Sequence, residues 1–572
     1  MITKIRYNRL ILTLRFSVLV ILVGFISQSC NEDEFLNEQP LDFYAPENSY
    51  VTSEDFDAAL LTLYSDYRDY MYAQRTPRTF WDISDIALSY YYAQGTRQVN
   101  TRLTPSSTEE VLSLWEAFYK LIYDANVIIG RSDEVASQLT DEEKVKVQAE
   151  AMFFRGLAYN ILANLFGGVP LVLEETKAPN RDYVRASRQA IYEQCAKDLE
   201  FATANLDGID EVYDFKISNL VASHVLSEVY ISLGRWQDAI AAASKVIDDP
   251  NTALMTQRFG SRVNDPDFGG DVYWDLFRKG NQNRSSGNRE SLWVIQWAYN
   301  TPGGGVNRDY SLARNICPVL HSAEIIQSDG STETVLNQPN TYIANRGVGY
   351  SGPSPYFRRT VWEKSGFDQD MRNSSHNIVR DVQVMNPANE FNGQWVIADN
   401  LPLVKVTEVD TLQRFYPIIM KAVTPGLDPI EFWHQDQSVP GALTAQAGTT
   451  YRDHMEIRLA ETYLLRAEAH LGNGNTAAAA EDINAVRRRA TAPDVTAGEV
   501  DIDYILDERM RELYYEEFRL ITLMRLGKAV ERIKTLNPVV GEHMEDYQNL
   551  FPIPISEIQK NTGAVLEQNP GY

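Results

Sequence analysis

Two short segments of the chain place aromatic rings beside polar side chains. The candidate contacts in the first segment are Trp81, Tyr90, Tyr91 and Tyr92. Those in the second are Trp297, Tyr299, Asn300 and Arg308. Aromatic rings stack on the flat C–H faces of sugars, and amide or guanidinium groups bond to hydroxyls, so both segments are candidate carbohydrate contacts. The alternative for each ring is a place in the core, although three consecutive tyrosines cannot all point inward from one element.

The sequence lacks the compact motifs that usually mark a catalytic centre. It has no His-Glu-x-x-His zinc motif, no Walker loop and no Gly-x-Ser-x-Gly motif. A stretch beginning at Asp265 imitates a calcium loop, but Leu276 stands where a bidentate glutamate is required. Adjacent carboxylates such as Glu516 and Glu517 point in different directions on a helix, although distant carboxylates could still meet in space. We therefore expect no catalysis, no metal and no cofactor.

The first thirty residues have the form of an export signal. Residues 1–29 contain four basic residues and no acid, and an apolar run from Phe16 to Ile26 ends in small residues before Cys30. This run is too short to cross a hydrocarbon core of about 30 Å, so it is typical of a secretory signal. A Cys at this point resembles a bacterial lipoprotein signal, although Ser27 replaces the usual Leu. We expect Cys30 to be lipidated and to anchor the chain to a membrane; a plain signal with an incidental Cys is the alternative.

The charge balance is strongly acidic. The 572 residues include 78 acidic and 53 basic side chains, for a net charge of −25, and removal of residues 1–29 leaves 49 basic against 78 acidic side chains, or −29. Nucleic-acid binding requires an electropositive surface, so we expect no nucleic-acid partner. The acidic residues 31–34 after the Cys are similar to the signal that directs lipoproteins of the Bacteroidetes to the outside of the outer membrane. A solvated acidic tether is the other interpretation.

Helical hairpins are predicted on both sides of a central segment. Apolar residues recur at helical spacing in residues 50–130, 141–166 and 188–205. Residues 218–250 and 456–490 each resemble a tetratricopeptide repeat, with Gly234 and Gly474 at the turns. Such repeats must stack to bury their apolar faces. The predicted fold is therefore mainly α, a scaffold of tetratricopeptide-like helical hairpins.

The central segment, residues 251–450, has a different composition. It holds 17 of the 32 glycines and six of the nine tryptophans, and its Gly and Pro clusters mark loops of the kind that often carry binding residues. We expect a large, loop-rich, partly β insert that binds the ligand. The predicted organisation is a signal peptide (1–29), a lipidated Cys with an acidic tether (30–48), N-terminal helices (49–250), the insert (251–450), and C-terminal helices with a tail (451–572).

Four separated motifs are similar to those of one family, the SusD/RagB outer-membrane nutrient-binding lipoproteins of the Bacteroidetes. They are residues 150–170, which end in Leu-Phe-Gly-Gly-Val-Pro, residues 458–469, residues 505–519, and the tail formed by residues 550–554 and 566–572. In the insert only fragments match, at residues 288–296 and 368–372. The insert is the region with which members of this family select their ligands.

The resemblance implies a binding protein without catalysis, lipid-anchored on the outer membrane and facing the cell exterior. It implies a SusC-like TonB-dependent transporter as partner and a glycan as the usual ligand, and it places the loops that contain Tyr91 and Tyr299 near the binding face. Peptide binding by a RagB-like protein on the same scaffold is the alternative. A lipid-anchored hydrolase is disfavoured.

Overall fold

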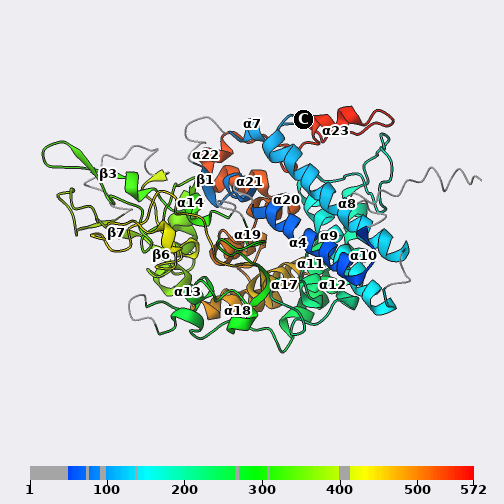
Figure 1. Ribbon diagram of the computed structural model, residues 1–572, viewed down its shortest axis with the longest axis horizontal. Helices are drawn as coiled ribbons and strands as arrows, with labels where there is room; N and C mark the ends of the chain where they lie inside the picture. Colours follow the sequence, from blue (N-terminus) through cyan, green and yellow to red (C-terminus); the bar gives the residue numbers. More distant parts are fainter. Residues whose placement is uncertain are drawn as a thin grey trace, which may run out of the picture.

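The computed structural model describes residues 49–72, 76–89, 98–134, 139–264, 269–305, 310–397 and 413–572. Five residues singled out from the sequence lie outside these ranges, namely Cys30, Tyr90, Tyr91, Tyr92 and Arg308. The helices gather at one end of the molecule and the insert extends from the other (Figure 1). The predicted fold class, mainly α with a partly β insert, is confirmed.

The helices before the insert are α4 (Ser53–Tyr72), α5 (Thr76–Asp82), α7 (Val99–Arg102), α8 (Ser113–Glu134), α9 (Asp141–Phe166), α10 (Arg188–Asn205), α11 (Asn219–Ser232) and α12 (Trp236–Ile247). Those after it are α17 (Leu459–Gly472), α18 (Thr476–Arg489), α19 (Ile502–Leu513), α20 (Arg519–Arg525), α21 (Ala529–Leu536), α22 (Pro538–Gly541) and α23 (Ile555–Lys560). The local sequence explains where several of these helices begin and end. At the start of α9 the Thr140 hydroxyl accepts from the Glu143 N–H and the Glu143 carboxylate accepts from the Thr140 N–H, and Gly167 ends the helix at φ 75°.

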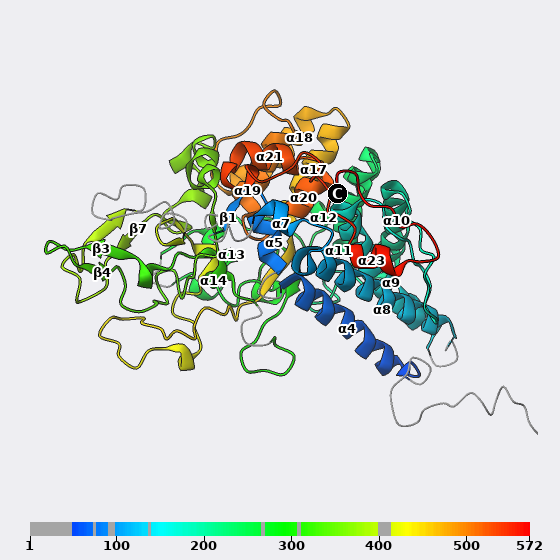
Figure 2. The same ribbon diagram turned by 90° about the horizontal axis from the view of Figure 1, so that it is seen from above.

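The repeat helices that precede the insert stack directly on those that follow it. Contacts run from α8 through α9, α10, α11 and α12 directly to α17 and α18, an arrangement that Figure 2 shows from above. Ala239 and Ala243 are buried at the α11–α12 contact. At the α12–α17 contact, a methyl group on Gly472 would lie 2.6 Å from the Trp236 ring. Small residues therefore let the two predicted repeats pack as neighbours.

The strands form five two-stranded antiparallel sheets within the described residues. The pairs are β1 (Ala87–Ser89) with β5 (Ser351–Pro353), β2 (Ser291–Ile295) with β10 (His454–Arg458), β3 (Glu324–Ile326) with β4 (Thr332–Thr334), β6 (Ile378–Val379) with β9 (Ile418–Ile419), and β7 (Asp381–Gln383) with β8 (Trp395–Ile397). The short helices of the insert are α13 (Val272–Leu276), α14 (Leu312–Ile316) and α15 (Val361–Glu363). The β1–β5 and β2–β10 pairs join the insert to the helical part.

One large hydrophobic core includes residues from both helical regions and from the insert. Phe154 of α9, Trp293 of β2 and Leu520 of α20 all belong to it, and every residue of β2 is buried. The insert is thus packed against the helices through a shared core. None of the helices that the structure describes is long and apolar enough to cross a membrane.

Candidate functional site

Trp81, the first predicted contact, lies in the core. Its side chain is 2% exposed, its indole N–H donates to the Glu517 carbonyl at 3.2 Å, and its ring meets Tyr515 edge-on at 4.9 Å. Nearby Asp85 pairs with Arg519 at 2.8 Å. In this structure the segment binds the C-terminal helices and offers no ring face of Trp81 for stacking, contrary to the predicted exposure.

Trp297 supports the loop that follows β2. Its ring is buried and stacks on Tyr310 with centroids 5.4 Å apart. The Arg68 guanidinium lies 5.1 Å from the ring centroid and donates to the Gly303 carbonyl at 2.7 Å. A methyl group on Gly305, at φ 89°, would lie 2.5 Å from the ring. Trp297 therefore shapes the loop and has little surface to give a ligand.

Tyr299 and Asn300 lie at the surface, where the loop turns. The turn is closed by a 2.9 Å hydrogen bond from the Ala298 N–H to the Gly304 carbonyl, and exposed Asn300 adopts φ 50°, a left-handed conformation that Asn tolerates. The half-buried Tyr299 ring contacts two further rings, Tyr451 at 4.9 Å and Phe432 at 5.5 Å. We call these three rings together with Asn300 the Tyr299 surface.

The Tyr299 surface has the chemistry expected of a carbohydrate contact. Phe432 and Tyr451 stack at an interplanar angle of 18° and hold Tyr299 edge-on, which limits the motion of a ring that a sugar face could cover. Asn300 supplies both a donor and an acceptor for hydroxyls. Phe432 and Tyr451 could not be predicted from the sequence, because no local pattern links them to a loop that starts at residue 296.

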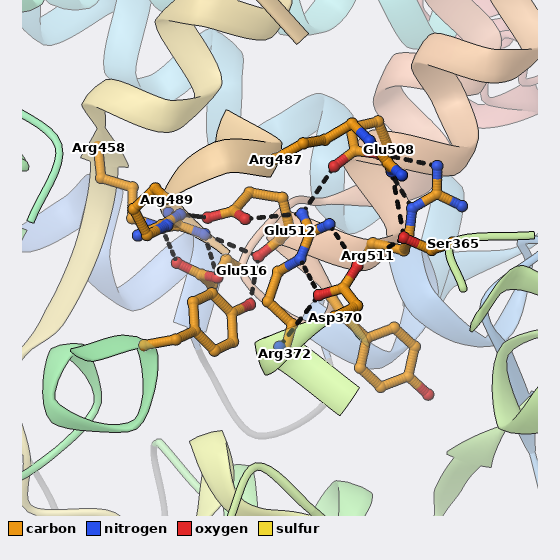
Figure 3. Close-up of polar contacts among 12 residues, drawn as sticks. Ser365, Asp370, Arg372, Arg458, Arg487, Arg489, Glu508, Arg511, Glu512 and Glu516 are labelled. Carbon is orange, nitrogen blue, oxygen red and sulfur yellow. Dashed lines mark hydrogen bonds and ion pairs between the residues drawn. The ribbon is translucent and has the colours of Figure 1, made fainter. Parts of the chain in front are cut away.

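Carboxylates distant in sequence do meet, in a buried cluster, and Figure 3 shows part of it. Its acidic members are Glu290, Asp370, Glu508, Glu512 and Glu516, and its basic members are Arg372, Lys421, Arg458, Arg487, Arg489 and Arg511. Glu508 and Glu512 lie one turn apart on α19, and both contact Arg372 of the insert, at 2.7 and 3.0 Å. The cluster therefore links the insert to α18 and α19.

This cluster has the features of a structural ion-pair network. Burial by itself would raise the pKa of Glu508, but Arg372 and neighbouring guanidinium groups outweigh that effect and hold the pKa well below its usual range. Burial and three arginines act in the same opposing way on Glu512, with the same net lowering of the pKa. A glycosidase needs one carboxyl group that stays protonated and reaches the substrate. Both glutamates are ionised and fully buried, so neither suits that role.

Other concave sites lie apart from the Tyr299 surface. A cavity of about 690 Å³ lies on the helical part between α8, the 170–183 segment and α23. A smaller one of about 170 Å³ lies in the insert beside β7 and β8. Among the residues that the structure describes, no group of three or more His, Cys, Asp or Glu is arranged to hold a metal ion.

Family models match both sides of the insert. A model described as "SusD family" matches residues 433–572, and one described as "Starch-binding associating with outer membrane" matches residues 34–231. The chain belongs to the SusD/RagB family. Neither model spans residues 232–432, which include Tyr299.

Individual SusD-like proteins are similar to this chain, some over nearly its whole length and others over a part of it. A SusD-like protein of Formosa agariphila is 23% identical over 588 residues, covering 97% of this chain and 99% of that protein. Starch-binding protein SusD of Bacteroides thetaiotaomicron is 38% identical over only 122 residues, or 20% of this chain and 21% of that one. A solved laminarin binding SusD-like protein has a TM-score of 0.63 at 23% identity and covers 91% of this chain and 100% of its own. At these identities the structural likeness establishes the fold.

Proposed function

We propose that this SusD/RagB protein is a lipoprotein of the outer membrane that binds a nutrient glycan at the cell surface. It passes the bound glycan, chemically unchanged, to a SusC-like TonB-dependent transporter. Cys30 carries the lipid anchor, and the insert carries the ligand contacts. Of the predicted contacts that the structure describes, Tyr299 and Asn300 lie at the surface, and we assign the ligand contact to them.

The Tyr299 surface is the observation that carries the proposal. It presents a ring held by two other rings, beside an exposed amide, on a loop that Trp297 and Arg68 anchor to the helical part. A rigid aromatic platform beside hydrogen-bonding groups suits a neutral, polyhydroxylated ligand. The names of two relatives, a starch-binding and a laminarin binding protein, support the glycan class without naming the sugar.

Binding calorimetry tests the proposal directly. The chain from residue 31 onward, which contains every described residue, is titrated with starch, laminarin, xylan and mannan, with oligosaccharides from each, and with a mixed peptide digest. We expect binding to one glycan class, with oligosaccharide length unchanged on prolonged incubation. Tyr299→Ala should weaken that binding by about ten-fold, because a lost aromatic contact is worth about 1–2 kcal/mol.

Tyr213→Ala is the matched control. Tyr213 is 77% exposed, lies outside the insert and packs on Phe215, so its loss should leave affinity unchanged. Equal affinities for the Tyr299 and Tyr213 variants would remove Tyr299 from the site. Binding to peptides alone would assign the protein to the RagB-like peptide binders, and shortened oligosaccharides would show hydrolysis.

A further inference from the structure

The 170 Å³ groove of the insert lies beside the β7–β8 hairpin, close to the outer end of the molecule in Figure 1. On one face of this hairpin Val382 and Val396 are buried. The opposite face carries Asp381, Gln383 and Trp395, because side chains alternate along a strand and Gln383 is paired directly with Trp395. These three residues line the groove, together with Val382 of the buried face.

Two aromatic side chains border the groove and both are exposed. Trp395 is 62% exposed and Tyr342 is 39% exposed. Tyr342 is held in place by two glycines, since a methyl group on Gly441 would lie 2.5 Å from its ring and one on Gly426 would lie 3.2 Å away. A large exposed Trp is unusual on a protein surface and often marks a binding site.

The groove also contains an unmet hydrogen-bond acceptor. Among the interactions of the described residues, buried Oδ1 of Asp381 accepts no hydrogen bond. A buried carboxylate oxygen without a donor is costly. Asp381 lines the groove, so rotation of its carboxylate toward the groove would let a ligand hydroxyl supply the missing donor and gain affinity. The Gln383 amide N–H donates to the Gly393 carbonyl at 2.8 Å, which fixes the side chain and leaves its carbonyl oxygen as a second acceptor.

We propose that this groove is a second saccharide subsite, which takes one ring of a bound glycan between Trp395 and Tyr342 with its hydroxyls donating to Asp381. The inference rests on the proposed function and adds a site to it. The volume suits a single ring, since sites that enclose a drug-sized ligand measure about 300–1,000 Å³. The hydroxyl groups of the sugar would donate hydrogen bonds to the acceptors on Asp381 and Gln383 without adding charge. The C–H face of the sugar ring would cover the exposed indole of Trp395.

The same loop connects this subsite to the Tyr299 surface. Phe432 belongs to the Tyr299 surface, and Gly441 supports Tyr342. The intervening chain is closed by bridges that pair Trp433 with Leu443 and Asn340 with Ala442. The proposal extends to one polysaccharide chain that contacts both places, an arrangement that would favour long ligands over short ones.

Two variants of the chain from residue 31 onward test the subsite, Trp395→Ala and Asp381→Leu. Each is titrated by calorimetry with the glycan panel and peptide digest described above, and its unfolding midpoint is measured in urea. We expect each variant to bind the preferred polysaccharide about ten-fold more weakly. The midpoint of Asp381→Leu should not fall, because Leu removes a buried oxygen that has no partner. A carboxylate with a purely structural role would instead lower the midpoint and spare the affinity.

The outcomes separate this inference from the proposed function. Unchanged glycan affinity in both variants, with Tyr299→Ala weakened, overturns the subsite and leaves the proposed function standing. Absence of glycan binding by the unchanged protein overturns both. Loss of peptide binding in Trp395→Ala, without any glycan binding, overturns the saccharide assignment. Tyr213→Ala again serves as the control with an exposed ring elsewhere.

Discussion

At the scale of single residues, Glu456 shows how the fold changes the chemistry of a side chain. It occupies a bulge of β10 between Met455 and Ile457, and its carboxyl group accepts hydrogen bonds from the Tyr67 and Tyr72 hydroxyls of α4. Burial raises the pKa of Glu456 to about 7, although the two hydrogen bonds lower it. The bulge turns this side chain toward α4, where its protonated form is favoured.

This raised pKa makes stability fall as pH rises from about 5 to about 7, because the folded chain holds a proton that the unfolded chain has released. Above about pH 7 both states have lost it and the cost is constant. We expect Glu456→Gln to remove this pH dependence. Its free energy of unfolding should exceed that of the unchanged protein by about 1–3 kcal/mol between about pH 5 and pH 8. Urea unfolding of both proteins across that range measures the difference.

Comparing Glu456→Gln with the unchanged protein cancels the contributions of the other titrating groups to the free energy of unfolding. Burial lowers the pKa of His224 and His454 to about 3, so both histidines make the fold less stable in acid, equally in the two proteins. Exposed Glu431→Gln is the control and should leave the profile unchanged. If the free energies of unfolding of Glu456→Gln and of the unchanged protein changed with pH in parallel, the raised pKa of Glu456 would be contradicted.

At the scale of elements, α19 joins the insert to the repeat helices. Glu508 and Glu512 face Arg372 of the insert on one side and Arg487 and Arg489 of α18 on the other. All five side chains are buried. Charged side chains in such a place must be paired, since an unpaired buried charge is strongly destabilising. The insert therefore depends on α19 for the compensation of its own buried charge.

Removal of one partner should expose that dependence. Arg372→Met leaves Asp370, Glu508 and Glu512 short of a cation, so we expect the free energy of unfolding to fall by about 3–5 kcal/mol. Arg488→Met is the matched control on α18, because Arg488 is half exposed and pairs with Asp494 and Glu481 at the surface. That variant should lose less than about 1 kcal/mol. Equal losses in urea unfolding would show that the buried cluster is not what joins the insert to the helices.

At the scale of the whole molecule, the described chain is a stack of repeat helices that supports the insert through a shared core. The proposed lipid on Cys30 would attach this entire body to the membrane by its first mature residue. The acidic residues that follow Cys30 would be repelled by an anionic membrane surface, which favours a body held away from the bilayer.

Attachment through Cys30 predicts a simple fractionation result. The full chain expressed in a Bacteroidetes host should sediment with the outer membrane, and Cys30→Ala should move it to the soluble fraction, because one apolar signal without acyl chains gives no stable anchor. Cys195→Ala is the control, since this free thiol is buried within α10. A Cys30→Ala protein that still sediments with the membrane would contradict the anchor.

Helices and their boundaries could be predicted well, because their causes are local. The apolar spacing in residues 141–166, the Thr140 cap and Gly167 together mark α9. The two repeat-like segments became the α11–α12 and α17–α18 hairpins. The family motifs fall in these same regions, where packing between repeats restricts the residues that fit.

The binding residues could not be predicted equally well. Tyr299 and Asn300 lie at the surface as expected, and their contact with a ligand stays a prediction. Trp81 and Trp297 were chosen for the same ring chemistry and are buried, while exposed Trp395 was counted only among the tryptophans of the insert. Nothing within a few residues of a Trp distinguishes these cases.

The amino-acid sequence by itself determined the helical repeats, the acidic charge and the family, because each depends on residues that are near one another in the chain or on composition. Only the tertiary structure decided which rings are exposed. Trp81 is covered by Tyr515, more than four hundred positions away, and Tyr342 is held by Gly426 and Gly441. Burial is set by long-range packing, and that packing exists only once the chain has folded.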